Sequence, residues 1–259
     1  MNFEGKTIIV TGSSRGLGAK TAEMLRERGA RIIGMDKNES TEFVDHYIPL
    51  DLADASSIEA AAAQIDEPIH GLCNIAGVAP TLPPPLVLKI NFTGTRALTN
   101  ALMPKLSDGA SIVNIASGTG LGWPRNVAKH KVLFGLGLDA DFDAYCAEYD
   151  IEKANAYHFS KEAVIMWTIG EWKNIEERGI RMNAINPGPI ETPLLADFLS
   201  DMITEDAPMH QMKRSNGTPE EIANVILFLC SDQSSWVHGT TIAADGGLSA
   251  IVMKRIHQF

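Results

Sequence analysis

Residues 6–36 read KTIIVTGSSRGLGAKTAEMLRERGARIIGMD, and this stretch decides the fold. A short β-branched run (6–11) leads through the glycine-rich turn GSSRGLG (12–18) into a helical pattern. A second apolar run over 31–35 then ends at Asp36. Strand, glycine turn, helix and strand within about 30 residues form a βαβ unit, so we expect the two strands to pair in parallel.

Further apolar runs alternate with helical patterns along the rest of the chain. Strands are expected at 47–50, 71–75, 111–115, 181–186 and 241–244, and helices at 55–65, 87–105, 154–178 and 219–230. This alternation predicts an α/β fold, a Rossmann-type doubly wound parallel sheet with helices on both faces. With 259 residues, 45% of them hydrophobic, the chain is expected to form a single domain over 1–259.

Two stretches interrupt the alternation. Residues 80–85 (PTLPPP) hold four prolines and are expected to form a loop. Residues 118–153 lie between a predicted strand and the next predicted helix, and ordinary connections have about two to six residues. We interpret 118–153 as an inserted, partly helical element with a functional or interfacial role.

Composition excludes several classes of protein. A net charge of −10 argues against binding of nucleic acid, which needs clustered basic residues. The N-terminus lacks the apolar region of a signal peptide and no run reaches ~18 apolar residues, so we expect a cytoplasmic protein without a membrane span. Cys73, Cys146 and Cys230 lie far apart without metal-ligand spacing, which predicts packing residues, no disulfide and no metal site.

The glycine turn and Asp36 together indicate a dinucleotide site. Glycines 12, 16 and 18 lack a Cβ, so backbone N–H groups and a helix N-terminus can approach a pyrophosphate. Asp36 ends the second strand, 18 residues after Gly18, where a carboxylate can accept both ribose hydroxyls of NAD and would repel the 2′-phosphate of NADP. We therefore expect NAD as the cofactor.

NADP is the alternative cofactor, because Arg15 in the glycine turn and Lys37 beside Asp36 could reach a 2′-phosphate. NAD remains favoured, since a buried carboxylate facing a phosphate costs more than exposed basic residues usually recover.

A tyrosine and a lysine four residues apart, Tyr157 and Lys161, lie in a predicted helix and share one of its faces. A phenol with a pKa of about 10 is a poor base at neutral pH. A lysine ammonium one turn away and a cationic nicotinamide ring would lower the pKa of Tyr157. Tyr157 could then take the proton of an alcohol while hydride leaves for the nicotinamide.

At this point the sequence resembles the classical short-chain dehydrogenases, whose motifs it carries in their usual order and spacing. The shared motifs are GSSRGLG (12–18), NIAG (74–77), Asn91, Ser117, Tyr157 with Lys161, and NPGPIET (186–192). The resemblance runs from residue 6 to about residue 247. It implies the Rossmann-type fold and an oxidoreductase that interconverts an alcohol and a carbonyl with NAD(H).

The resemblance also implies a role for each catalytic residue. Tyr157 resembles the acid/base, and Lys161 the residue that binds the nicotinamide ribose and lowers the pKa of the tyrosine. Ser117 resembles the serine that hydrogen-bonds the substrate oxygen. Asn91 resembles the helix asparagine whose backbone holds a water linking the lysine to a proton relay.

A larger set of residues is implied to contact the cofactor. These residues are Gly12, Ser14, Arg15, Gly16, Leu17, Gly18, Asp36, Asp51, Leu52, Asn74, Ala76, Gly77, Tyr157, Lys161, Pro187, Gly188, Ile190 and Thr192. Many relatives carry the motif Asn-Asn-Ala-Gly, whereas this chain has Ile75 in the second position of that motif. The transfer of residue roles from the family is therefore least direct at Ile75.

The substrate side points to one branch of the family. Ser117 and Tyr157 are 40 residues apart, against about a dozen in most members, and 77–91 is correspondingly short. This resembles the branch of bacterial coniferyl-alcohol dehydrogenases and 3α-hydroxysteroid dehydrogenase/carbonyl reductases. Residues 71–78, 123–124 and 181–183 lean toward the first group. A small apolar alcohol or ketone is therefore the expected substrate, an aromatic allylic alcohol before a steroid.

Aromatic and methionine side chains are candidates for the substrate pocket, although the same residues are also ordinary core or interface material. The candidates are Trp123, Phe134, Phe142, Tyr145, Tyr149, Met166, Trp167, Phe198 and Met202. The insertion is expected either to cover this pocket or to contact another subunit in a homodimer or homotetramer, and the tail 251–259 is a second candidate subunit contact.

Three histidines remain without an assigned role, and one alternative function lies outside the enzymes. His130, His158 and His210 are given no catalytic part, because a lone histidine is more often structural. A protein that senses NAD(H) without turnover is the alternative outside the enzymes. It is disfavoured because it would have no use for Ser117 and Tyr157 together with Lys161.

Overall fold

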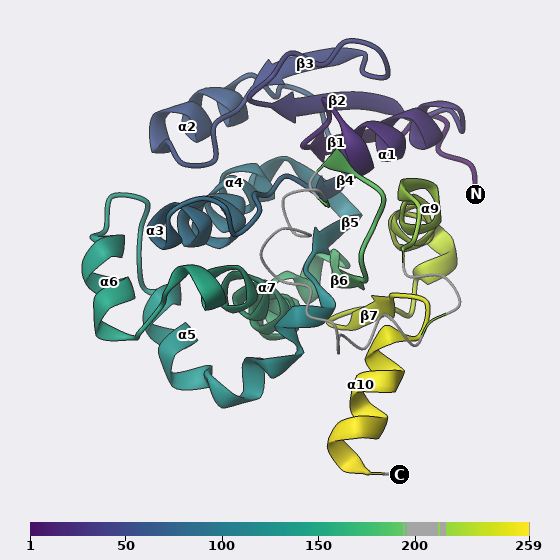
Figure 1. Ribbon diagram of the computed structural model, residues 1–259. Helices are drawn as coiled ribbons and strands as arrows, with labels where there is room; N and C mark the ends of the chain where they lie inside the picture. Colours follow the sequence, from purple (N-terminus) through teal and green to yellow (C-terminus); the bar gives the residue numbers. More distant parts are fainter. Residues whose placement is uncertain (194, 196–211, 213–215, 259) are drawn as a thin grey trace.

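The computed structural model describes residues 1–193, 195, 212 and 216–258. In this part of the chain a seven-stranded parallel sheet runs in the order β3-β2-β1-β4-β5-β6-β7 (Figure 1). Its strands are β1 (Thr7–Thr11), β2 (Arg31–Asp36), β3 (His46–Pro49), β4 (Ile69–Asn74), β5 (Leu106–Ile115), β6 (Arg181–Pro187) and β7 (Thr241–Ala244). The order reverses between β1 and β4, and this confirms the predicted doubly wound α/β fold.

Helices connect the strands and cover both faces of the sheet. Those outside the insertion are α1 (Gly16–Arg26), α2 (Ala55–Ala63), α3 (Pro84–Leu88), α4 (Thr95–Leu102), α7 (Lys153–Ile175), α9 (Pro219–Cys230) and α10 (Leu248–His257). Short turns of other pitch are the π-helical turn η1 (Lys89–Gly94) and the 3₁₀ turns η2 (Met103–Lys105), η4 (Glu176–Arg178) and η6 (Asp232–Ser234).

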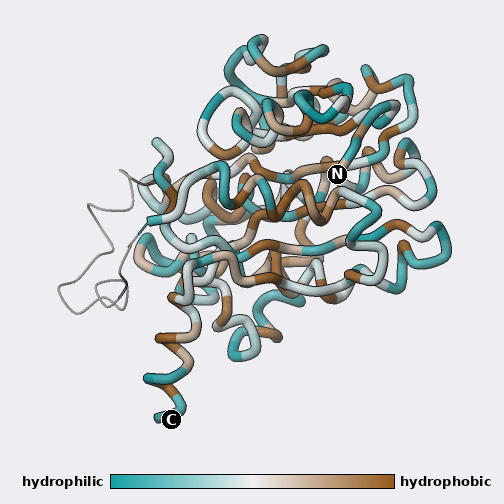
Figure 2. Tube along the Cα trace, turned by 90° about the vertical axis from the view of Figure 1, so that its right-hand side faces the viewer, coloured by the Kyte–Doolittle hydropathy of each residue, from teal (hydrophilic) through white to brown (hydrophobic). Residues whose placement is uncertain are grey.

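The sheet divides the core into two layers, because successive strand residues point to opposite faces. On β1, Ile9 packs in the larger core with α2, α4 and α7, whereas Ile8 and Val10 pack in the smaller core with α1 and α9. Brown apolar segments run through the middle of the molecule in Figure 2. The strands are buried on both sides, which explains their nearly continuous apolar sequences.

The predicted loop at 80–85 is wrong for its last two residues. Pro84 and Pro85 form the first turn of α3, after Pro83 with φ −54° and ψ 140°. The first turn of a helix needs no internal N–H donor and suits a fixed φ near −65°, so proline is compatible with these positions. The expected helix over 87–105 is consequently longer at its start and is interrupted by the π-helical turn.

The insertion is partly helical, as expected. It contains the 3₁₀ segment η3 (Gly118–Arg125), α5 (Val127–Phe134) and α6 (Phe142–Glu148). In Figure 1 these elements lie beside α3 and α7. Leu133, Phe142 and Tyr145 are buried in the larger core, so the insertion is an integral part of the domain.

The three cysteines are free thiols, in agreement with the sequence. Cys73 on β4 and Cys230 at the end of α9 lie with their Sγ atoms 3.5 Å apart in a hydrogen-bonding contact. Within residues 1–193 and 216–258, no helix has both the length and the apolar character needed to cross a bilayer.

Candidate active site

One cavity of about 1450 Å³ opens at the carboxyl ends of the strands. Its walls include Gly12 after β1, Asp36 at the end of β2, Ser117 after β5 and Gly188 after β6. Ligands of open α/β sheets bind at this edge, where the strand order reverses. Ordinary small-molecule pockets measure about 300–1,000 Å³, so the cavity has room for a dinucleotide together with a substrate.

The glycine turn is closed by contacts that leave no space for side chains. Gly12 has φ +70°, and a Cβ added there would lie 3.0 Å from the backbone of Ala76. A Cβ on Gly18 would lie 2.0 Å from the carbonyl oxygen of Gly12. The residue before α1, Arg15, makes no side-chain cap, so the first N–H groups of the helix face the cavity without a capping side chain.

Asp36 is held at the edge of the glycine turn. Its Oδ2 accepts hydrogen bonds from the backbone N–H of Ser14 at 3.0 Å and from the Ser14 hydroxyl at 2.8 Å. The other oxygen accepts from the N–H of Asn38 at 2.9 Å. The side chain is therefore fixed beside the pyrophosphate turn, in the position expected for a contact to the adenine ribose.

Lys37, which the sequence offers as a possible phosphate ligand, is paired with another cofactor-site residue. Its Nζ lies 2.7 Å from Oδ2 of Asp51. This contact lowers the pKa of Asp51 and raises the pKa of Lys37. The positive charge of Lys37 is therefore already balanced by the carboxylate of Asp51.

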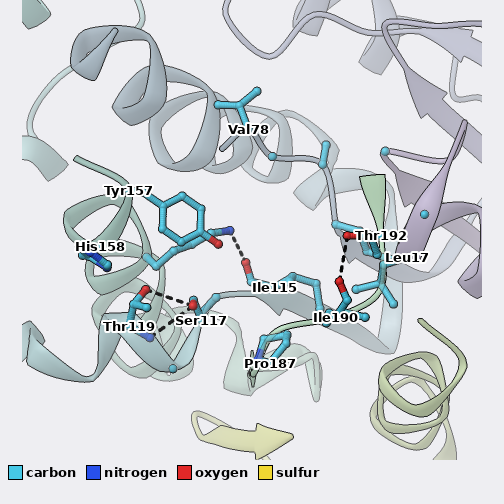
Figure 3. Close-up of a pocket in the computed structure, with 18 of the residues that line it drawn as sticks. Leu17, Val78, Ile115, Ser117, Thr119, Tyr157, His158, Pro187, Ile190 and Thr192 are labelled. Atoms are coloured by element: carbon cyan, nitrogen blue, oxygen red, sulfur yellow. Dashed lines mark hydrogen bonds between the residues drawn. The ribbon is translucent and has the colours of Figure 1, made fainter. Parts of the chain in front are cut away.

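Tyr157 and Ser117 meet at the inner end of the cavity. The Ser117 hydroxyl is fixed by Thr119, whose backbone N–H and hydroxyl lie 3.3 and 3.1 Å from it (Figure 3). Tyr157 is 8% exposed, and burial raises its pKa to about 12, while a hydrogen bond with Ser117 acts in the opposite direction. Burial thus disfavours the phenolate in the protein alone, and the lowering of this pKa by Lys161 together with a cationic nicotinamide ring stays a prediction.

Lys161 reaches the cavity from the same face of α7 as Tyr157. Its Nζ donates to the carbonyl oxygen of Ile115 at 2.8 Å and lies 5.6 Å from the centroid of the Tyr157 ring (Figure 3). Burial lowers the pKa of Lys161 to about 8. The ammonium is thus placed to interact with both the phenol and a ribose bound next to it.

Asn91 lies behind this group, in the π-helical turn. Its side-chain amide accepts from the N–H of Val78 at 2.8 Å and donates to the carbonyl of Val78 at 3.0 Å. Nδ2 also donates to the Ser160 hydroxyl at 3.2 Å. A Cβ on Gly77 would lie 3.2 Å from Oδ1 of Asn91 and 3.7 Å from Nζ of Lys161, so the three residues adjoin.

Most residues that the sequence assigns to the site line the cavity. They are Gly12, Ser14, Arg15, Gly16, Leu17, Gly18, Asp36, Asp51, Leu52, Ala76, Gly77, Ser117, Tyr157, Lys161, Pro187, Gly188, Ile190 and Thr192. Asn91 contributes from behind the wall. Asn74 faces the protein interior instead, where its Nδ2 donates to Thr99 at 3.0 Å and to Asn114 at 2.8 Å.

The cavity also has an apolar part, called the substrate half below, whose walls the sequence did not predict. Apolar side chains come from the segment after β4, from η3 and from α10, namely Val78, Leu82, Leu86, Leu121, Val252 and Ile256. The α10 residues Leu248, Val252 and Ile256 recur every four positions, a helical stripe that could have been read in the tail. Figures 1 and 2 both show α10 extending from the body of the molecule.

The aromatic candidates for the pocket pack elsewhere, as the alternative interpretation held. Phe142, Tyr145 and Trp167 are buried in the larger core, and Trp123, Phe134 and Tyr149 pack against it. None of these six lines the cavity, and Met166 does not either. Phe198, Met202 and His210 lie outside the described residues. His158, by contrast, does line the cavity, and burial lowers its pKa.

These features fit a nicotinamide dinucleotide. The glycine turn offers backbone N–H groups where a Cβ would collide, Asp36 offers a fixed acceptor, and the Tyr157–Lys161 pair lies across the cavity from them. Among residues 1–193 and 216–258, no cluster of histidine, cysteine and carboxylate side chains could hold a metal ion.

Comparisons with known proteins find similar sequences along nearly the whole chain. The short chain dehydrogenase family model matches residues 6–128, and a related model described as enoyl-(acyl carrier protein) reductase matches 142–249. A coniferyl-alcohol dehydrogenase of Pseudomonas sp. (strain HR199 / DSM 7063) is 38% identical over 255 residues, which cover 96% of this chain and 99% of that protein.

Two further relatives are 3α-hydroxysteroid enzymes. The 3-alpha-hydroxysteroid dehydrogenase/carbonyl reductase of Comamonas testosteroni is 30% identical over 263 residues, covering 95% of this chain and 97% of the relative. The crystal structure of the 3-alpha-hydroxysteroid dehydrogenase from Pseudomonas sp. B-0831 complexed with NADH superposes with a TM-score of 0.79 at 26% identity, covering 95% of this chain and 98% of that one.

Proposed function

The chain belongs to the short-chain dehydrogenase family of oxidoreductases, and on that premise we propose that it interconverts an aromatic allylic alcohol, such as coniferyl alcohol, and its aldehyde with NAD(H). The observation that carries the proposal is the match, along nearly its whole length, to a coniferyl-alcohol dehydrogenase. The apolar substrate half of the cavity supports it, because a planar aromatic ring gains by leaving water there.

The side chains divide the chemistry at the substrate oxygen between them. Ser117, held by Thr119, hydrogen-bonds that oxygen and orients it toward Tyr157. Tyr157 takes the alcohol proton in oxidation and returns it in reduction. Lys161 favours the phenolate by its charge, and its bond to Ile115 keeps the ammonium in place.

The cofactor would lie between the glycine turn and these residues. Gly12, Gly16 and the start of α1 would hold the pyrophosphate, and Asp36 the adenine ribose. When bound, nicotinamide supplies the acceptor or donor of hydride. The apolar walls of the cavity would exclude water from the reacting carbon.

The preference for NAD over NADP rests on Asp36. Two hydrogen bonds from Ser14 fix its carboxylate in the cavity, where a 2′-phosphate would meet a negative charge. Lys37 gives such a phosphate less help than its sequence position suggests, because Asp51 already pairs with it.

The first experiment follows NADH formation by the purified protein with coniferyl and cinnamyl alcohols and with a panel of 3α-hydroxysteroids, each with NAD and NADP. We expect turnover of the aromatic alcohols with NAD. Turnover of steroids alone would overturn the substrate proposal in favour of the second candidate, which the two 3α-hydroxysteroid relatives support.

The cofactor preference is tested by Asp36→Ala. Removal of the carboxylate should lower the ratio of kcat/KM with NAD to that with NADP by about tenfold or more. Asp108→Asn is the matched control, because Asp108 is an exposed carboxylate near the start of β5, away from the cavity. An unchanged ratio in Asp36→Ala would refute the assignment of Asp36 to the ribose.

The predicted homodimer or homotetramer stays a prediction. The apolar stripe of α10 and the exposed Trp236 are candidate contacts between subunits. The mass of the protein in solution tests whether an oligomer forms.

A further inference from the structure

A buried carboxylate stands next to the catalytic lysine in α7. Glu162 is only 6% exposed. Its Oε2 accepts a hydrogen bond from Nδ2 of Asn126 at 2.7 Å and one from Nε2 of His130 at 2.9 Å. A buried carboxylate is costly unless it is hydrogen-bonded, so these two contacts offset the burial of Glu162.

Both hydrogen-bond donors come from the insertion. Asn126 occupies the position before α5, where an asparagine usually caps the helix by accepting a backbone N–H, yet its side chain makes no cap. Its amide donates to Glu162 instead. His130 is completely buried and packs against Phe159 of α7, with ring centroids 4.1 Å apart and ring planes tilted by 34°. These contacts attach the start of α5 to α7, the helix that carries Tyr157 and Lys161.

The segment η3 fits closely on the same part of α7. A Cβ on Gly122 would lie 2.7 Å from Oε1 of Glu162, and a Cβ on Gly120 would lie 2.8 Å from the carbonyl carbon of Lys161. At Gly120 the neighbour is backbone, so only glycine fits there, and at Gly122 a Cβ would push the Glu162 carboxylate aside. Gly120 and Gly122 of the sequence GTGLG (118–122) thus serve the packing of η3 against the helix that carries Tyr157 and Lys161.

This packing bears most directly on the substrate half of the cavity. The segment η3 begins directly after Ser117, and its residues Leu121 and Pro124 line the cavity. Ser117 in turn hydrogen-bonds Tyr157. The pyrophosphate and adenine contacts come from other elements, α1 and β2 among them. A change at Glu162 should consequently be felt by the substrate and much less by the cofactor.

We propose that Glu162, through Asn126 and His130, is a positioning residue that fixes the inserted wall η3 and Ser117 relative to Tyr157 for alcohol oxidation, an inference that rests on the proposed dehydrogenase function. Glu162 does not line the cavity. It acts by setting where the substrate oxygen meets the serine and the tyrosine, and misplacement by about 1 Å can cost about 100-fold in rate.

The experiment compares Glu162→Ala, Glu162→Gln and Asn126→Ala with the unmodified full-length protein. Glutamine keeps an oxygen that accepts both hydrogen bonds, whereas the two alanine variants break the link from opposite sides. Glu177→Gln is the matched control, since Glu177 is an exposed carboxylate beyond the end of α7. Three quantities are measured: kcat and KM for coniferyl alcohol, the Kd of NADH by fluorescence, and deuterium uptake of residues 118–134.

We expect Glu162→Ala and Asn126→Ala to lower kcat/KM by about tenfold or more, to raise deuterium uptake of 118–134, and to change the Kd of NADH by less than about twofold. Glu162→Gln should restore most of the lost kcat/KM. The double variant Glu162→Ala/Asn126→Ala should be no worse than the poorer single variant, because both remove the same link.

A fall of NADH affinity in parallel with kcat/KM, or unchanged deuterium uptake of 118–134, would overturn the proposal. Asn126→Ala keeps the test valid if Glu162→Ala does not fold, because Asn126 is half-buried at the edge of the insertion. Absence of turnover in the unmodified protein would count against the proposed function, and the deuterium uptake and NADH titrations would still decide the role of Glu162.

Discussion

Replacing Lys161 by methionine should stabilise the protein while removing its activity. Lys161 is 5% exposed, and burial lowers its pKa from 10.5 to about 8. Each unit of pKa corresponds to about 1.4 kcal/mol, so the buried ammonium lowers the free energy of unfolding by roughly 3 kcal/mol near neutral pH. The bond from Nζ to the Ile115 carbonyl, worth about 1 kcal/mol, would be lost. The net gain expected is about 2 kcal/mol.

The gain should depend on pH in a defined direction. Below about pH 8 both the folded and the unfolded chain carry a protonated Lys161, so the folded state bears the complete cost. Between about 8 and 10.5 the folded state loses this proton while the unfolded state keeps it, and the cost to the unmodified protein shrinks. The advantage of Lys161→Met should therefore be largest near pH 7 and should decline toward pH 10.

Urea unfolding of both proteins near pH 7 and near pH 10, without added cofactor, measures this difference. For a domain of this size a gain of about 2 kcal/mol corresponds to a rise in Tm of roughly 4–8 °C. Lys173→Met, at an exposed position of the same helix, controls for the substitution itself. The reasoning fails if Lys161→Met is less stable than the unmodified protein near pH 7, or if its advantage is equal at both pH values.

Two other substitutions test the site more directly. Tyr157→Phe should lower kcat by about 10²–10⁴-fold without changing NADH affinity, because it removes only the group that carries the proton, and steady-state kinetics with a fluorescence titration would expose a variant that keeps its turnover. Gly18→Ala should abolish NADH binding, because its Cβ would lie 2.0 Å from the Gly12 carbonyl oxygen. Gly170→Ala, where a Cβ meets no atom within 4 Å, should bind NADH normally and unfold at a higher temperature, and equal NADH affinity of the two glycine variants would refute the account of the turn.

The parts of the fold and site that the sequence predicted are those encoded by local patterns. The strand–glycine turn–helix unit, the seven strands and the Tyr157–Lys161 pair each depend on residues close together in the chain. Family resemblance then added Ser117. In the structure this residue follows the end of β5 and lies beside Tyr157. For these features the spacing of residue types alone determines which side chains share a face.

The parts that the sequence did not predict depend on segments far apart in the chain. The apolar wall from α10 faces a cavity whose other walls come from residues as far away in the sequence as Gly12, and no periodicity in the tail tells which surface it meets. The aromatic residues of the insertion were equally compatible with a pocket and a core, and the buried Phe142 shows that packing decided. The raised pKa of Tyr157 was also not predictable, because the sequence reveals the charged neighbour Lys161 but not the burial of the phenol.

The π-helical turn at Lys89–Gly94 limits how this region can change in length during evolution. A π turn spans one residue more than an α turn, so deleting one residue here would yield a regular helix and change the angular spacing between Asn91 and Gly94. Asn91 could then no longer bridge both backbone groups of Val78 while Gly94 kept its approach to Leu52, where a Cβ would lie 1.9 Å from the carbonyl oxygen. We expect natural variants to exchange side chains here freely at positions such as Lys89, yet to keep the number of residues constant.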